Sequence, residues 1–214
     1  MLVYRFLNHE YGLMAIKDQE LRISRIMDLN DPFEFLSAEL VDPVKRTGLR
    51  NFKKNFSENY GLICFSENWS NPLLWGHYAD KHKGVCLGFE IPPDHLNKIN
   101  YVNERFTFSL ENHLKNGEEL IQKILFNKFN HWSYEEEYRL HTDLKEEDGD
   151  GNYFQQFSEN LILKKVIVGC ESKITREELV KTLGGVVSQV ELFRVRPSFL
   201  KFEVERNKNE SLWV

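Results

Sequence analysis

Apolar residues recur along the chain in two spacings, and each spacing predicts a different element. Alternating or continuous apolar stretches predict strands at residues 2–7, 21–25, 60–66, 84–91, 132–140, 161–169, 186–195 and 199–204. Apolar positions three and four apart, with capping residues, predict helices at residues 8–17, 72–82, 118–129 and 175–184, the last opening with a capping box of Thr175 and Glu178. Strands and helices follow one another irregularly, which favours an α+β fold over a doubly wound parallel sheet.

Side-chain chemistry refines two of these segments. Asn8 is a good N-cap residue, and the helix that follows it is expected to turn Tyr11, Met14 and Ala15 inward. The acidic, glycine-containing stretch 145–152 is expected to form a surface loop.

The composition favours one sizeable core. Of the 214 residues, 41% are apolar and 13% are aromatic, which is enough to bury a single core at this length. No repeat or composition shift marks a domain boundary. We therefore predict one domain over residues 1–214, with mixed, mainly antiparallel sheets and flanking helices, to which the strand–helix–strand region 161–206 also belongs.

The charge balance argues against a general nucleic-acid coat. The chain has 33 acidic residues against 28 Lys and Arg, a formal net charge of -5, whereas phosphate attraction needs a positive surface. One local exception is a basic cluster in residues 45–54, made of Lys45, Arg46, Arg50, Lys53 and Lys54. A solvated helix or loop face is the favoured interpretation of this cluster, and contact with a phosphate-rich partner is the alternative.

Cysteine usage and hydropathy indicate a cytoplasmic protein with no membrane partner. Cys64, Cys86 and Cys170 are odd in number and lack the paired spacing of disulfide frameworks or zinc sites. Charged residues interrupt the N-terminal apolar stretch before a signal-peptide core can form. No uncharged apolar run approaches the roughly 18 residues that span a bilayer.

The clearest candidate for chemistry is the glutamate-rich stretch 132–139. Strand alternation would place Glu135, Glu137 and Arg139 on one face, so that two carboxylates stand side by side. Such a pair is either an edge-strand charge ladder or a catalytic pair, and repulsion between the two tends to raise one pKa. His77 and His82 are five positions apart on a predicted helix, about 140° around its axis, so no metal site is expected there.

Several blocks together resemble a bacterial family catalogued as domain of unknown function 2971, over roughly residues 2–170. The resemblance lies in Tyr4-Arg5, Asn30-Asp31-Pro32-Phe33-Glu34, Phe65-Ser66-Glu67-Asn68, Trp75-x-His77-Tyr78-Ala79-Asp80-x-x-x-Gly84 and Trp132-Ser133-Tyr134-Glu135-x-Glu137-Tyr138-Arg139. The family name itself implies no activity.

The order of elements also resembles the ADP-ribosyltransferase fold. Residues 4–25, 61–68 and 85–90 are similar to its early strands and helix, and Glu135-x-Glu137 resembles its late Glu-x-Glu element. Cys64 stands where the poly-ADP-ribose polymerases have tyrosine, and the first strand offers Arg5 rather than histidine. Both differences resemble the Arg-Ser-Glu variant of the fold, although its fuller Ser-Thr-Ser motif is absent here.

This second resemblance implies a set of site residues and a substrate. Glu137, Glu135 and Ser66 would be catalytic, with Glu137 at the ribose, Glu135 at the acceptor and Ser66 in the serine role. NAD would be held by Arg5, Tyr4, Trp75, Tyr78 and His77, with Arg5 forking onto the pyrophosphate. Trp75 and Tyr78 are three apart and share a helix face, a spacing that favours core packing over a ligand platform.

The resulting expectation is an ADP-ribosyltransferase-like enzyme that consumes NAD and modifies an unknown acceptor, either a protein or a nucleic acid. A bacterial toxin or antiphage effector of this kind would also have an antitoxin or other regulatory protein as partner. Two alternatives stay open: a catalytically silent nucleotide-binding or interaction module of the same fold, and a nuclease or other hydrolase that uses Glu135 and Glu137 with a divalent cation.

Overall fold

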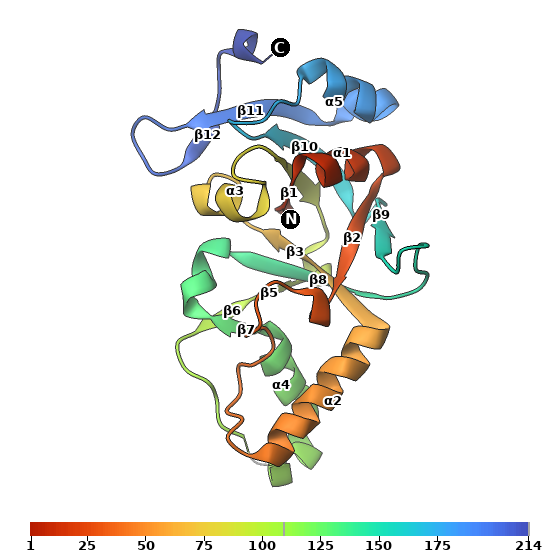
Figure 1. The fold of residues 1–214 in the computed structure, drawn as a ribbon, viewed down its shortest axis with the longest axis vertical. Coiled ribbons are helices and arrows are strands. Elements are labelled where there is room, and N and C mark those ends of the chain that lie inside the picture. The colour runs from red at the N-terminus through yellow and green to blue at the C-terminus, as the bar shows by residue number, and fades with distance from the viewer. Residues whose placement is uncertain (109, 214) are drawn as a thin grey trace.

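The computed structural model describes residues 1–108 and 110–213, and its largest element is a mainly antiparallel sheet (Figure 1). In this described part, ten strands form the sheet, in the order β12-β11-β10-β4-β1-β3-β2-β9, with β8 paired to β3 and to β5. The strands of this sheet are β1 (Leu2–Leu7), β2 (Glu20–Arg25), β3 (Tyr60–Ser66), β4 (Val85–Glu90), β5 (Leu96–Lys98), β8 (Glu137–Asp143), β9 (Tyr153–Gln156), β10 (Ile162–Val168), β11 (Glu191–Pro197) and β12 (Val204–Arg206). Two further strands, β6 (Asn100–Val102) and β7 (Asn127–Phe129), form a parallel pair apart from it.

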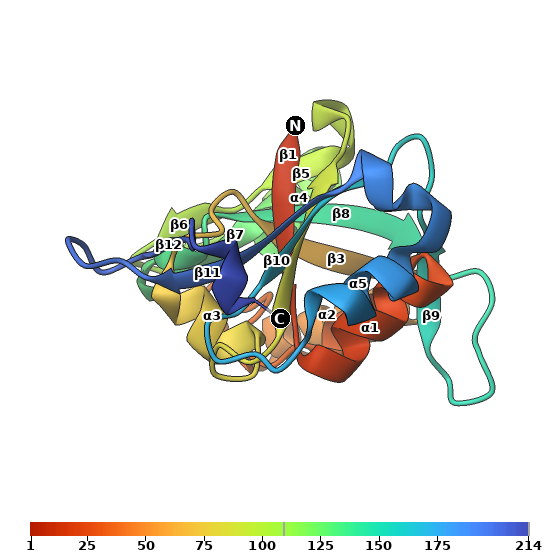
Figure 2. The same ribbon diagram turned by 90° about the horizontal axis from the view of Figure 1, so that it is seen from above.

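Helices cover both faces of the sheet. They are α1 (His9–Asp18), α2 (Pro43–Asn59), α3 (Pro72–Tyr78), α4 (Leu110–Phe126) and α5 (Arg176–Leu183). Helices α1 and α5 lie side by side over one face (Figure 2), where Val3 and Leu87 belong to the core. Helix α3 covers the other face, where Phe6 lies 5.3 Å from Trp75, ring centroid to ring centroid. The predicted α+β fold with a mainly antiparallel sheet is thus confirmed.

A third apolar cluster lies below the sheet, where α2 and α4 meet β3 (Figure 1). Leu62 of β3 packs there with Leu49 of α2 and Ile124 of α4, and the segment after β2 adds Phe35. The basic stretch 45–54 lies within α2, so it is helical. This cluster anchors α2 beside β3 and the turn that follows β2.

Local capping signals are confirmed. Asn8 caps α1 by accepting a hydrogen bond from the Tyr11 amide at 2.8 Å, and Thr175 caps α5 by accepting one from the Glu178 amide at 3.1 Å. The inward orientation predicted for α1 holds for Ala15 and is wrong for Tyr11 and Met14, both exposed. Gly12 and Ile16 are buried instead, because the helix rests on the sheet close to Val85, which leaves no room for a side chain at residue 12.

Two predicted helix ends are wrong. The helix predicted at 72–82 stops at Tyr78, and Asp80, Lys81 and His82 all have positive φ. This turn allows Gly84 to approach so closely that an added Cβ would lie 2.0 Å from the Leu7 carbonyl oxygen. The helix predicted to reach residue 129 ends at Phe126, where β7 begins.

Three predicted strands also differ from the structure. Residues 130–135 form a 3-10 helix, Glu136 has a φ of 44°, and only from Glu137 does β8 run, so stretch 132–140 is not one strand. The two C-terminal strands begin later than predicted, at residues 191 and 204. Phe199, Leu200 and Phe202 lie in an exposed loop, because no other described element covers them. In the described part of the chain, no helix combines the length and apolarity needed to cross a membrane.

Candidate functional site

Neighbouring strands bring three of the predicted site residues into one row. Tyr4 of β1 pairs with Ser66 of β3, and Ser66 pairs in turn with Glu137 of β8. Directly paired residues on adjacent antiparallel strands lie about 4.5–5.5 Å apart. The antiparallel order β1-β3-β8 therefore unites positions that are far apart in the sequence.

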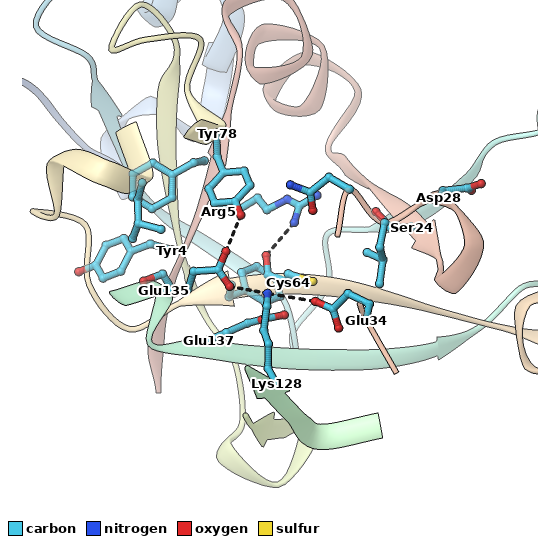
Figure 3. A pocket seen from close by; sticks show the side chains of 16 residues that line it. Tyr4, Arg5, Ser24, Asp28, Glu34, Cys64, Tyr78, Lys128, Glu135 and Glu137 are labelled. Carbon is cyan, nitrogen blue, oxygen red and sulfur yellow. Dashed lines mark hydrogen bonds and ion pairs between the residues drawn. The ribbon is translucent and has the colours of Figure 1, made fainter. Parts of the chain in front are cut away.

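This row borders a pocket of about 290 Å³ (Figure 3). Six predicted residues line it: Tyr4, Arg5, Ser66, Tyr78, Glu135 and Glu137. The rest of the wall includes Asp28, Asn30, Glu34, Cys64 and Lys128, none of which was predicted as a site residue. The pocket is therefore polar and acidic on the β8 side, and the Arg5 side chain enters it from β1.

Lys128, the middle residue of β7, is the hub of the acidic wall. Its Nζ lies 3.0 Å from Glu34 Oε1, 2.5 Å from Glu135 Oε2 and 2.9 Å from Glu137 Oε2. All four side chains are less than a tenth exposed. Burial alone would lower the pKa of Lys128, but the charges of the three carboxylates outweigh it and raise that pKa, so the ammonium stays protonated.

Arg139 is the second cation of this charged network and bonds two of the same carboxylates, Glu34 and Glu137. Its Nε donates to Glu137 Oε1 at 2.7 Å, its Nη2 donates to both Glu34 oxygens at 2.9 Å, and its Nη1 donates to the Leu125 carbonyl oxygen at 3.0 Å. The guanidinium is 1% exposed. A buried cation is tolerated only when it is paired and hydrogen-bonded, a condition that these bonds meet.

The two carboxylates of the Glu135–Glu137 pair have different environments. Burial would raise the pKa of Glu137, but Arg139 and Lys128 outweigh burial and lower it to about 2. Burial raises the pKa of Glu135, and the charge of Glu137 adds to this rise against the opposing effect of Lys128. Glu137 is thus a permanent anion, whereas Glu135 is the member of the pair that can take up a proton.

Two tyrosines hold this pair in place. The Tyr78 hydroxyl donates a short hydrogen bond to Glu135 Oε1, and burial together with the charge of Glu135 raises the pKa of Tyr78. The Tyr101 hydroxyl accepts a hydrogen bond from the Glu137 amide at 2.9 Å, which fixes the first residue of β8.

The remaining predicted residues differ in their involvement. Ser66 lines the pocket, but its hydroxyl donates to the Asn68 carbonyl oxygen at 3.0 Å and accepts from the Asn68 amide at 3.1 Å, so it also shapes a turn. Trp75 has no exposed surface and belongs to the core, so its predicted role in holding NAD is wrong. His77 is exposed, lies outside the pocket and stacks on Tyr134.

Sequence reasoning missed Glu34, Lys128 and the structural role of Arg139. Glu34 ends the Asn30–Glu34 block and Arg139 ends the last block, so both carried a signal that was not used. Lys128 fell inside a predicted helix and gave no signal. Among the residues that the structure describes, no group of three or more His, Cys, Asp or Glu side chains is arranged to hold a metal ion.

Comparison with known proteins gives one match. No curated protein and no solved structure matches the chain. One segment of the chain does match a family model, and it holds most of α3 with Tyr78, as well as Lys128, Glu135, Glu137 and Arg139, so it contains most of the charged wall of the pocket. That segment, residues 74–140, matches a family described as protein of unknown function (DUF2971), which supports the first of the two resemblances.

Proposed function

We propose that the pocket binds NAD and that the protein is an ADP-ribosyltransferase-like enzyme. One observation carries this proposal: Arg5, Ser66 and Glu137, the three residues that the resemblance assigns to the Arg-Ser-Glu set, line the same pocket although they are far apart in the sequence. Glu135 lines it as well, next to Glu137.

The charge of Glu137 suits the first half of the reaction. The bond between ribose C1′ and the nicotinamide nitrogen breaks, the nicotinamide leaves with the bonding electrons, and positive charge develops on the ribose. A carboxylate that stays ionised stabilises this charge, which exists mainly in the transition state. A carboxylate has about four acceptor positions, and a thiol is only a weak donor. Glu137 uses three positions on Arg139 and Lys128 and the Cys64 thiol takes a fourth, so a ribose hydroxyl would displace this weak donor.

Glu135 suits the second half. An acceptor oxygen or nitrogen forms the new bond to C1′ and releases its proton, which Glu135 takes up. A base works best when its pKa lies near the working pH, and the raised pKa of Glu135 moves it in that direction. The hydrogen bonds from Tyr78 and Lys128 orient its carboxylate.

The size of the pocket limits which part of NAD can lie inside it. A volume of about 290 Å³ lies at the lower end of small-molecule sites, so the nicotinamide riboside end of NAD is placed inside and the adenylate end outside. In the described structure Arg5 donates from Nη1 to the Cys64 carbonyl oxygen at 2.8 Å. A guanidinium has five N–H donors, which leaves others for the pyrophosphate at the pocket entrance.

Substitution of Glu137 tests the proposal. Purified protein is incubated with NAD labelled in the adenylate part, and both free nicotinamide and labelled acceptor from a cell extract are measured. Glu137→Gln should lower the rate by roughly a hundredfold to a thousandfold, the usual cost of losing one transition-state stabiliser. The matched control is Glu136→Gln, because Glu136 lies between the pair yet is exposed and outside the pocket.

The outcomes separate the candidate functions. Full activity in a folded Glu137→Gln protein contradicts the assignment. NAD binding without nicotinamide release favours a silent binding module, the second candidate, which is supported by the pairing of both carboxylates with cations. Activity lost on chelation favours the metal-dependent hydrolase. If the enzyme is a toxin or antiphage effector, its expression should slow bacterial growth and the Glu137→Gln variant should not.

A further inference from the structure

A large groove lies beside the pocket, between α2 and the end of β2. It encloses about 840 Å³, and five cationic side chains line it: Arg25, Arg46, Arg50, Lys53 and Lys54. The acidic residues that line it are Asp28 and Glu58. The groove therefore carries a net charge of about +3 in a chain whose total is -5, and such a local excess attracts anions.

The spacing of the cations on α2 produces a continuous stripe. Residues 46, 50, 53 and 54 are separated by four, three and one positions, so they share one side of the helix. At 1.5 Å per residue the stripe is about 12 Å long. Arg25, at the end of β2, also lines the groove, where its Nε is paired with Asp28 Oδ2 at 2.9 Å.

Most of this positive charge is not neutralised by acids. Arg46 donates to the carbonyl oxygens of Leu40 and Val41, and Lys53 donates to the Glu34 carbonyl oxygen at 2.8 Å. A neutral carbonyl positions a cation without cancelling its charge. Lys54 lies 4.0 Å from Glu58, and both side chains are more than half exposed, so solvent weakens that pair.

The groove adjoins the pocket directly. Asp28 lines both cavities, and Figure 3 shows it at the edge of the pocket beyond Ser24. Lys53, in the groove, bonds to the backbone of Glu34, whose side chain belongs to the charged wall around Lys128. The two cavities therefore share a wall, and an occupant of the groove lies next to the pocket.

We propose that this groove binds a single-stranded nucleic acid and presents it as the acceptor to the pocket. Apolar and aromatic side chains, including Met27, Leu36 and Tyr153, lie among the cations, and this mixture suits bases and phosphates together. A lipid surface would need a flat or projecting basic face, whereas this one is hollow. Binding does not depend on the proposed function, but the acceptor role does, since a base or sugar atom would replace nicotinamide at C1′ and give its proton to Glu135.

Binding is tested on the full chain without NAD. Fluorescence anisotropy is measured with labelled DNA and RNA single strands of about 12 nucleotides, within the usual site size, over a series of salt concentrations. Each neutralised phosphate contributes about -0.7 to the slope of log K against log salt for single strands, so three contacts predict a slope of about -2. Arg50→Gln with Lys54→Gln should reduce that slope to less than half and weaken binding at low salt.

Controls make the result specific. Arg50 and Lys54 are exposed, so their loss should leave the unfolding midpoint unchanged. Lys181→Gln, at an exposed lysine on α5 outside the groove, should leave the slope unchanged. No oligonucleotide binding, binding unaffected by the double variant, or preference for anionic vesicles or an acidic peptide would each overturn the inference.

A second experiment, with NAD present, distinguishes oligonucleotide binding in the groove from transferase activity in the pocket. With labelled NAD, transfer of label to the oligonucleotide supports both. Oligonucleotide binding with no NAD cleavage supports the groove and contradicts the transferase. NAD cleavage without oligonucleotide binding supports the transferase and contradicts the groove.

Discussion

Replacing Lys128 by methionine perturbs the network on which the site is built. The change keeps a long unbranched side chain but removes the ammonium that contacts Glu34, Glu135 and Glu137. Three carboxylates and two cations carry one formal negative charge, and without Lys128 the same buried group carries two. Breaking a buried ion pair by removing one partner typically costs about 3–5 kcal/mol.

This loss should be large enough to measure by heating and by urea. For a protein of this size, 1 kcal/mol shifts the melting temperature by about 2–4 °C, so Lys128→Met should melt about 6–20 °C lower. The matched control is Lys123→Met, which breaks a pair with Glu119 at 2.8 Å between two well-exposed side chains. Solvent screens that pair, so the control should lose much less stability.

A second substitution and a change of pH identify the cause. Adding Glu135→Gln to Lys128→Met restores one net negative charge, so the double variant should be more stable than Lys128→Met alone. Burial raises the pKa of Glu135, and loss of the opposing Lys128 raises it further. A carboxyl with a raised folded-state pKa stabilises the fold at low pH and loses this contribution as pH rises through that pKa. The deficit of Lys128→Met should therefore be larger at pH 8 than at pH 5.

Either of two results would contradict a charge-pairing role for Lys128. One is a Lys128→Met protein that melts within 2 °C of wild type, which would mean that the carboxylates need no cation. The other is a deficit that neither Glu135→Gln nor acid reduces, which would mean that Lys128 stabilises the fold through packing of its aliphatic chain.

Two further perturbations test positions outside the pocket, the half-buried His141 and the buried Gly84. Burial lowers the pKa of His141 from 6.5 to about 4. The free energy of unfolding, measured with urea, should therefore decrease by up to about 3 kcal/mol as the pH is lowered from 6.5 to 4. His141→Phe should reduce this pH dependence, and His131→Gln, at an exposed position, should not. Gly84→Ala should lower the unfolding midpoint by the equivalent of about 1–3 kcal/mol, since its Cβ would meet backbone near Leu7. Gly48→Ala in α2 meets nothing within 4 Å and should be neutral or stabilising, so equal effects of the two glycine changes would contradict the steric argument.

Local patterns in the sequence determined much of the fold. The bounds of β1 and β3, the caps of α1 and α5 and the glycine that ends α5 follow from interactions within a few residues. The α+β class and the mainly antiparallel sheet follow from the irregular order of these elements. The resemblance to the ADP-ribosyltransferase fold, and not these local patterns, grouped Arg5, Ser66 and the Glu135–Glu137 pair, and all four residues line one pocket.

Only the tertiary structure decided how that pair is held and what surrounds it. Strand alternation placed Glu135 beside Glu137, whereas a 3-10 turn and a left-handed Glu136 bring both onto Lys128 instead. Glu34 bonds Arg139 across 105 positions of sequence. Periodicity reports only which face of an element is apolar, and it carries no information on which distant cation will neutralise a buried carboxylate. That pairing is set when the sheet brings the strands together, because buried charges are stable only where their partners meet them.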